Sequence, residues 1–346
     1  MSGCTTLFMA LMLEFLNALF SHPSHRLDEL NPSLTDRALE RAIDGSDPRI
    51  RALDHYRERL RGPIDTTIRH IVELISELPP PIPFDLERFS ELPFIRALFV
   101  TPRDLEQSLI RLTQTREYQD EPELLTASAL YGLMTVEMED RRIFGMEVVG
   151  DHLQRDVIQD TVNFKEASFL GLGESEEASL RKLRICAFDY LVEQALTCQT
   201  QRRMDSMPRR GERCPLTEKL TVMRQGYWGL GLSGSTQGKV YLEADIQRIQ
   251  SAIRTTGHLS LSLEDSLDCL IEVFSRPDEY LKAETLKLHL DLRGIRQNGP
   301  VKDGFNLDLT LIKTPEGQSR VVQFGTIPRA SIRSALARNP HLGTLG

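Results

Sequence analysis

Apolar residues at helical spacing form the clearest pattern in the chain. They are Ile64, Ile68, Ile71, Ile75 and Leu78, at intervals of four, three, four and three residues. Residues at this spacing share one face of an α-helix. Pro63 suits the first position of that helix, where its missing N–H would have no partner. We therefore predict a helix over 64–78 whose isoleucines pack in a core.

Further helices are predicted on both sides of this one. Ser33–Asp36 resembles a capping box, and the period that follows it stops at Gly45. A second period runs from Leu53 to Gly62. The proline run at 79–83 must be extended, either as a rigid spacer or as a polyproline ligand, and Thr101 precedes another helix. Residues 1–125 are thus predicted to be a helical region.

The pattern changes to strict alternation near residue 130. Apolar and polar residues alternate over 134–139 and again over 144–148, with Asp140–Arg142 between them. Alternation with a period of two is typical of a half-buried strand. We predict a β-hairpin with a charged turn at Asp140–Arg142, and a third strand around Val162 and Phe164. A long helix is predicted from about Ser175, so that hairpin and helix occupy 126–198.

The C-terminal part combines helices with alternating strands. Residues 199–215 are arginine-rich and lack an apolar period, as in a linker. Helices are predicted over 242–253 and after Ser262. Leu286–Leu292, Phe305–Ile312 and Arg320–Ile327 are predicted to form an antiparallel sheet with buried leucines. The predicted fold class is therefore α+β, predominantly α-helical, with a small antiparallel sheet at the end of segment 216–346.

An apolar run over Leu7–Phe20 needs its own interpretation. The first basic residue is Arg26, so the charged start of a secretory signal is missing. The run is short for a bilayer and is interrupted by Glu14 and Asn17, so integral membrane insertion is not expected. We predict a helix covered by the protein's own core. The alternatives are a helix that binds a partner or lies on a membrane surface.

Composition narrows the class of protein. The 346 residues carry a formal net charge of −8, which opposes a surface built throughout to bind nucleic acid. The five cysteines are widely spaced without a C-x-x-C pair, so we expect reduced thiols and no structural zinc. Arginine far outnumbers lysine, which we attribute to the codon usage of a bacterial genome. We expect a cytoplasmic bacterial protein with no metal and no cofactor.

Two groups of residues are weak candidates for catalysis. The first group follows the predicted hairpin and consists of Glu147, Asp151, His152 and Asp156. Carboxylates with an imidazole can bind a divalent metal or exchange protons. The second is His289, with Asp291 on the same side of its strand and Asp308 on a neighbour, since a carboxylate can orient an imidazole base. For both groups the preferred explanation is an ordinary solvated polar surface, and we expect His289, Asp291 and Asp308 to face solvent.

Two further motifs bear on ligands. The predicted linker contains the arginines Arg202, Arg203, Arg209, Arg210 and Arg213, whose guanidinium groups could contact phosphate or an acidic protein surface. The letters of a dinucleotide-binding loop occur at Gly229–Gly234, but the segment before it is predicted to be helical rather than a strand. We therefore expect this loop to bind no nucleotide.

These observations favour a non-enzymatic interaction or scaffold protein, whose partner is another protein or a second copy of the chain. One alternative is an enzyme with its site near Asp151 and His152 or at His289. The other is binding of nucleic acid or an acidic partner through Arg202–Arg213, which the overall acidity disfavours.

Overall fold

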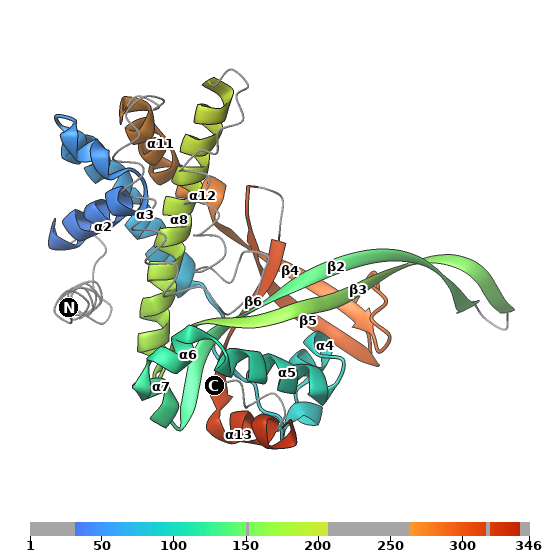
Figure 1. Ribbon diagram of the computed structural model, residues 1–346. Coiled ribbons are helices and arrows are strands. Elements are labelled where there is room, and N and C mark those ends of the chain that lie inside the picture. The colour runs from blue at the N-terminus through green and yellow to red at the C-terminus, as the bar shows by residue number, and fades with distance from the viewer. Residues whose placement is uncertain (1–31, 150–151, 207–262, 316–318, 340–346) are drawn as a thin grey trace. The chain divides into compact units, whose positions relative to one another are not determined.

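The computed structural model describes residues 32–149, 152–206, 263–315 and 319–339 (Figure 1). The chain divides into two compact units that are each discontinuous in sequence. One contains residues 1–77 and 181–281, and the other contains residues 78–180 and 282–346. The predicted N-terminal helix, the helix over 242–253 and the Gly229–Gly234 loop lie outside the described residues.

The first unit is helical in its described part. Its elements are α2 (Pro32–Gly45), the 3-10 turn η1 (Pro48–Ala52), α3 (Tyr56–Ser76), most of α8 (Glu176–Ser206), α11 (Leu263–Ser275) and α12 (Pro277–Tyr280). The apolar positions of the predicted helical periods are buried, among them Leu39, Ile43 and Ile71. Phe188 of α8 stacks on Phe274 of α11 with ring centroids 5.6 Å apart. The helical periods therefore converge on one core.

Two sequence-based boundaries in this unit are wrong. The helices predicted over 53–62 and 64–78 are one helix, α3, with Pro63 in its interior. Burial of Leu60 and Ile64 on both sides of the proline offsets the backbone hydrogen bond that proline cannot make. The linker predicted from residue 199 is wrong for 199–206, because α8 continues to Ser206, and the rest of the predicted linker lies outside the described residues. Gln199 is buried there and donates from Nε2 to the Ser266 carbonyl at 3.0 Å.

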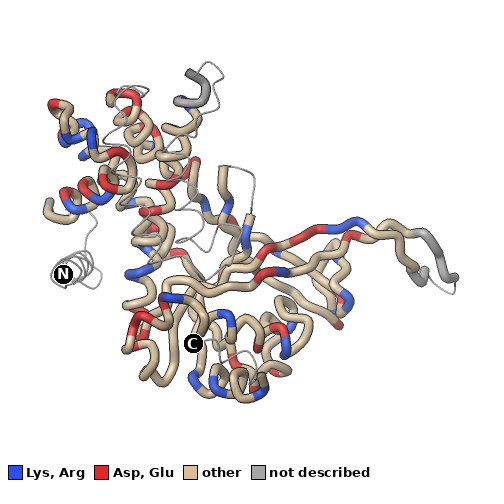
Figure 2. The backbone as a smooth tube through the Cα atoms, in the orientation of Figure 1, with Lys and Arg blue, Asp and Glu red and all other residues tan. Residues whose placement is uncertain are grey.

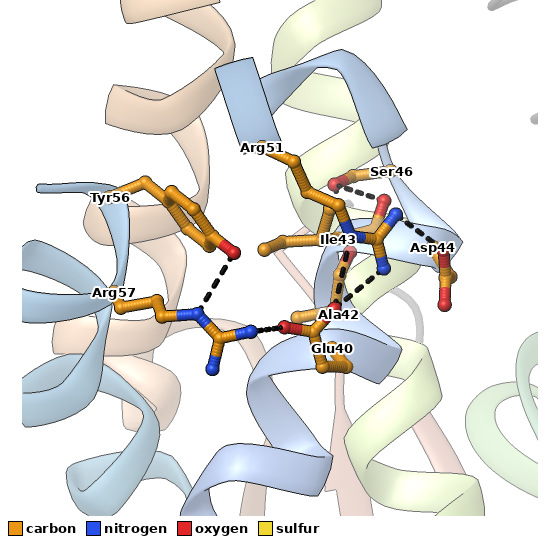
Figure 3. A network of polar contacts seen from close by, with 8 residues as sticks. All are labelled: Glu40, Ala42, Ile43, Asp44, Ser46, Arg51, Tyr56 and Arg57. Carbon is orange, nitrogen blue, oxygen red and sulfur yellow. Dashed lines mark hydrogen bonds and ion pairs between the residues drawn. The ribbon is translucent and has the colours of Figure 1, made fainter. Parts of the chain in front are cut away.

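Ion pairs join the helix ends of this unit (Figure 3). The Glu40 carboxylate of α2 accepts from Arg51 of η1, 2.7 Å from Nη2, and from Arg57 of α3. Arg51 also pairs with Asp44 at 2.9 Å, and Arg57 donates to the Tyr56 hydroxyl at 3.0 Å. These carboxylates raise the pKa of Arg51 above its ordinary value. Since each charge of this network is paired within the chain, we interpret the network as structural: it holds α2, η1 and α3 together.

The second unit is built on a six-stranded sheet. Its strands are β1 (Ile82–Pro83), β2 (Ala129–Val149), β3 (His152–Gly173), β4 (Lys282–Asp291), β5 (Gly304–Lys313) and β6 (Ser319–Pro328). The order is β3-β2-β6-β5-β4, and β1 pairs in parallel with β6. The helical elements are η2 (Phe89–Glu91), α4 (Pro93–Leu98), α5 (Pro102–Thr113), α6 (Arg116–Asp120), α7 (Pro122–Thr126) and α13 (Arg329–Arg338).

One hydrophobic core holds the second unit together. It joins Leu105 and Leu109 of α5 and Ile332 of α13 to the inward residues of the strands, such as Leu309 and Val321. α5 and α13 lie on one side of the sheet (Figure 1). The Thr101 hydroxyl and the Asp104 carboxylate form a capping box at the start of α5. The sequence-predicted helix after Thr101 and the three C-terminal strands are thereby confirmed.

The predicted fold class is wrong about the sheet. It is neither small nor confined to the C-terminus, because β2 of the central hairpin pairs with β6 from Ala129↔Pro328 to Glu137↔Arg320. The C-terminal strands and the hairpin thus form a single sheet. Leu292 also departs from prediction, being 64% exposed, because β4 ends at Asp291 and Leu292 lies in the turn beyond it.

The predicted charged turn of the hairpin is also wrong. β2 runs without interruption through Asp140–Arg142 as far as Val149, and Val162 and Phe164 belong to the second strand of the hairpin rather than to a third one. The charged residues have partners across the ladder instead of forming a turn: Arg142 Nε lies 3.0 Å from Asp160 Oδ1. Local sequence cannot distinguish a charged turn from a charged rung of a long ladder.

Candidate functional site

The hairpin of β2 and β3 extends beyond the rest of the sheet (Figure 1). β6 pairs with β2 only as far as Glu137, whereas the β2–β3 ladder continues to Val149↔His152. We call residues 138–149 of β2 and 152–164 of β3 the β-arm. A two-stranded ribbon of this length needs support at its base, because isolated hairpins are marginally stable in water.

A turn after β4 supplies that support. The Asp291 carboxylate accepts from the backbone N–H groups of Arg293 at 2.8 Å and Ile295 at 2.9 Å, which shapes the turn. Gly294 adopts a left-handed conformation with φ of 79°, which glycine tolerates without strain. Its carbonyl accepts from the N–H of Val162 at 2.9 Å. The turn therefore binds the outer edge of β3 at the base of the β-arm.

Ion pairs strengthen the same base. Arg296 donates from its backbone N–H to the Asp160 carbonyl at 2.7 Å, and its guanidinium lies 2.9 Å from the Asp140 carboxylate. Glu139 lies 2.9 Å from Arg141 and 2.5 Å from Lys165. The hydrogen bonds to Lys165 and then Arg141 hold the pKa of Glu139 below its usual value. The base is thus a charged, internally paired segment.

Beyond the charged base the β-arm presents exposed apolar side chains. Phe144 is 75% exposed and pairs in register with Ile158, which is 62% exposed. Met146 and Ile143 are 56% and 43% exposed. Of the seven large apolar side chains that are exposed in the described part of the chain, these are four. This concentration separates the β-arm from the scattered exposed apolar residues normal on any surface.

The exposed row continues the core-facing side of the hairpin. Residues directly opposite in an antiparallel ladder share a face, and so do residues two apart along a strand. Met138↔Phe164 and Asp140↔Val162 precede Arg142↔Asp160 and Phe144↔Ile158 on that face. Met138, Phe164 and Val162 pack with the core. The same face that is covered by the core at the base is therefore uncovered farther out.

A bulge near the end of β3 bends the hairpin. Glu137 pairs with Lys165, whereas Thr135 pairs with Ser168, so β3 has one extra residue there. Glu166 in this stretch has a φ of 51°, a conformation uncommon for residues other than glycine. An extra residue bends the strand and increases its twist. The bulge lies where β2 leaves its pairing with β6, at the root of the β-arm.

The first group of catalytic candidates falls on the far end of the β-arm. The backbone of Glu147 pairs with Gln154, and that of His152 pairs with Val149, while Asp156 is the unpaired residue at a second bulge in β3. Asp151 lies outside the described residues. No set of three or more histidine, cysteine and acidic side chains in the described segments could hold a metal ion.

The second group of candidates is not brought together by β4 and β5. His289 Nδ1 lies 2.8 Å from Oδ1 of Asn306, its neighbour in the ladder, rather than from a carboxylate. The Asp291 carboxylate accepts hydrogen bonds from the turn at the base of the β-arm. Asp308 pairs in register with Lys287 and is exposed. His289 itself is half-buried. No acid–base pair forms among these three residues.

The arginine candidates are divided by the end of α8. Arg202 lies in α8 and forms an ion pair with Glu272 of α11. The backbone of Arg203 belongs to the same helix, while Arg209, Arg210 and Arg213 lie outside the described residues. The one arginine whose side chain the structure describes thus has an acidic partner within the chain.

Sequence reasoning missed the β-arm as a surface. The alternation of Phe144, Met146 and Val148 predicted a strand, but burial of one face was assumed. The available signal was that the apolar positions over 134–138 and 144–148 are all even-numbered, so the alternation keeps the same phase on both sides of Asp140–Arg142. A strand pair that long exceeds the usual length of five or six residues and indicates a projecting ribbon.

No helix among the described residues is both long enough and apolar enough to span a bilayer. Comparison with known proteins adds no family to this description: no family model, no curated protein and no solved structure matches the chain.

Proposed function

We propose that this is a non-enzymatic interaction protein that pairs with a second copy of itself through the β-arm. The observation that carries the proposal is the exposed apolar row of Phe144, Ile158 and Met146 on a two-stranded ribbon. Uncovered apolar side chains at this density favour removal from water by association.

The distribution of charged side chains on the β-arm favours a second copy of the chain over a charged partner. The charged side chains in the described part of the β-arm already have partners in the chain: Glu139 with Arg141 and Lys165, Asp140 with Arg296, and Arg142 with Asp160. The residues around the Phe144–Ile158 pair, 143–146 and 157–159, are uncharged (Figure 2), and charged residues resume beyond them at Glu147 on β2 and at Asp156 on β3. A two-fold interface brings each patch against its own copy, so a neutral patch avoids the like-charge repulsion that this acidic chain would otherwise meet.

Backbone geometry supplies the pairing element. β3 is an edge strand of the sheet, and the turn after β4 bonds to it only at 160–162. Among the described elements, no strand therefore lies beside the outer edge of β3 over 152–159. An unpaired edge is a template for a further strand. Two copies of this edge, related by a two-fold axis, pair antiparallel and bring the two Phe144–Ile158 rows into one continuous face.

Sedimentation velocity over a concentration series tests this proposal. Phe144→Glu places a charge in the row and should weaken the dimer roughly a thousandfold, since a central aromatic residue contributes about 2 kcal/mol and a two-fold interface contains it twice. Phe144 is 75% exposed, so the variant should fold, which circular dichroism checks.

Val100→Glu is the matched control, because Val100 is 86% exposed and lies between α4 and α5 rather than on the β-arm. It should sediment as the unmodified chain does at every concentration. A chain that stays monomeric at high micromolar concentration would refute self-association. A dimer that Phe144→Glu leaves intact would refute the β-arm as its interface.

A further inference from the structure

Two cysteines of the helical unit lie side by side. Cys198 of α8 and Cys269 of α11 are 71 positions apart in sequence, and their Sγ atoms are 2.7 Å apart. A disulfide bond is about 2.0 Å long, so a small approach of the two sulfur atoms would complete one. Both are free thiols here. The spacing of cysteines in the sequence gives no sign of this pair.

The surroundings hold the two helices in register at this point. Gln199, next to Cys198, bonds the Ser266 carbonyl, and Arg202, one turn farther on, pairs with Glu272. Cys269 is fully buried and Cys198 is half-buried. Only Cys198 is therefore exposed to a reagent in solution, while Cys269 stands behind it.

The surroundings shift the pKa values of the two thiols in opposite directions. The hydrogen bond between the sulfur atoms, together with the Arg202 charge, lowers the pKa of Cys198 despite its partial burial. The same hydrogen bond and burial raise the pKa of Cys269. Of the two thiols, Cys198 therefore loses its proton more readily than Cys269, and it is the thiolate form that reacts with oxidants.

We propose that Cys198 and Cys269 are a redox-active pair that hydroperoxides oxidise to a disulfide joining α8 to α11. Arg202 is a positioning residue that stabilises the Cys198 thiolate. This pair is independent of the β-arm and of self-association.

The chemistry balances in two steps. The Cys198 thiolate attacks the distal oxygen of the hydroperoxide, the O–O bond breaks, and the released alkoxide or hydroxide takes a proton from water, leaving a sulfenic acid on Cys198. The sulfur of Cys269 then attacks the Cys198 sulfur. The S–O bond breaks, and the leaving hydroxide combines with the thiol proton as water. Two thiols lose two electrons in all, and the hydroperoxide gains them.

Peptide mapping of the full chain tests the pair directly. The protein is treated with one equivalent of hydrogen peroxide, remaining thiols are blocked with iodoacetamide, and non-reduced peptides are identified by mass spectrometry. The expected product is a Cys198–Cys269 linked peptide that dithiothreitol removes. Cys269→Ser should stop at the sulfenic acid, trapped by dimedone on Cys198, and Cys186→Ser should behave as the unmodified chain. Linked peptides distributed among other cysteines, or oxidation of Cys198 to sulfinic acid without a link, would overturn the proposal.

The role of Arg202 has its own readout. Alkylation of Cys198 by iodoacetamide is followed against pH in the unmodified chain, in Arg202→Gln and in the charge-conserving Arg202→Lys. Arg202→Gln should shift the pH profile to higher pH and slow alkylation near neutrality several-fold, whereas Arg202→Lys should stay close to the unmodified chain. Identical profiles in all three proteins would exclude Arg202 from the site.

Discussion

Gly325 has no room for a side chain. It pairs with Gly132 of β2 and, on its other side, with Ile82 of β1. A Cβ at this position would lie 2.2 Å from a ring carbon of Phe84 and 2.6 Å from the Ile82 carbonyl oxygen. The ring can shift, but the carbonyl belongs to the backbone of the paired strand. Close approach of three strands therefore requires glycine here.

Gly325→Ala should consequently destabilise the chain by about 1–3 kcal/mol, as overpacking does. Gly62→Ala is the control in the opposite direction. A Cβ at Gly62 meets nothing within 4 Å, and the residue lies inside α3, so alanine should stabilise by about 0.5–1 kcal/mol. Urea unfolding followed by circular dichroism measures both. Equal stability of the two variants would contradict the described packing around Gly325.

At the scale of elements, substitutions on the two faces of α3 test which face packs in the helical core. Ile71 is 3% exposed, so Ile71→Asp puts a charge without a partner into an apolar site and should cost about 3–5 kcal/mol. Thr66→Asp, at an exposed position of the same helix, should change stability by less than about 1 kcal/mol. Thermal unfolding of both variants checks this. An unchanged melting temperature for Ile71→Asp would contradict the assignment of its face.

Elements whose signal is local were predictable from sequence. α5 follows its capping box, and β4, β5 and β6 follow their alternation to within a few residues. Errors arose where distant residues decide the outcome. Arg142 forms a rung of the ladder because Asp160 stands opposite it. The end of α8 continues as helix because Gln199 finds a carbonyl on α11. Neither partner is visible in the local pattern.

The candidate surfaces depend on the same distinction. Alternation predicts that Phe144 lies on one face of a strand. Only the complete sheet shows that none of the described elements covers that face, which leaves the Phe144 side chain 75% exposed. The Cys198–Cys269 pair joins helices 71 positions apart, so it requires the folded chain. Sequence thus predicts which residues share a face, and the structure decides which faces remain open.

At the scale of the whole molecule, the two units have different compositions. The unit formed by residues 78–180 and 282–346 contains the six-stranded sheet and the β-arm. The unit formed by residues 1–77 and 181–281 contains the cysteine pair and, in its described part, only helices. We assign self-association to the unit that contains the β-arm and thiol oxidation to the unit that contains Cys198 and Cys269. Phe144→Glu should therefore leave formation of the Cys198–Cys269 disulfide unchanged.

Amide hydrogen exchange at two protein concentrations tests the central claim most directly, because it reports where copies meet. Self-association through the β-arm predicts that backbone amides over 152–159 exchange more slowly at the high concentration than at the low one, and that Phe144→Glu removes the difference. Amides of β4 and β5 should exchange equally in both samples. Concentration-dependent protection confined to segments outside the β-arm, with 152–159 unchanged, would contradict the account.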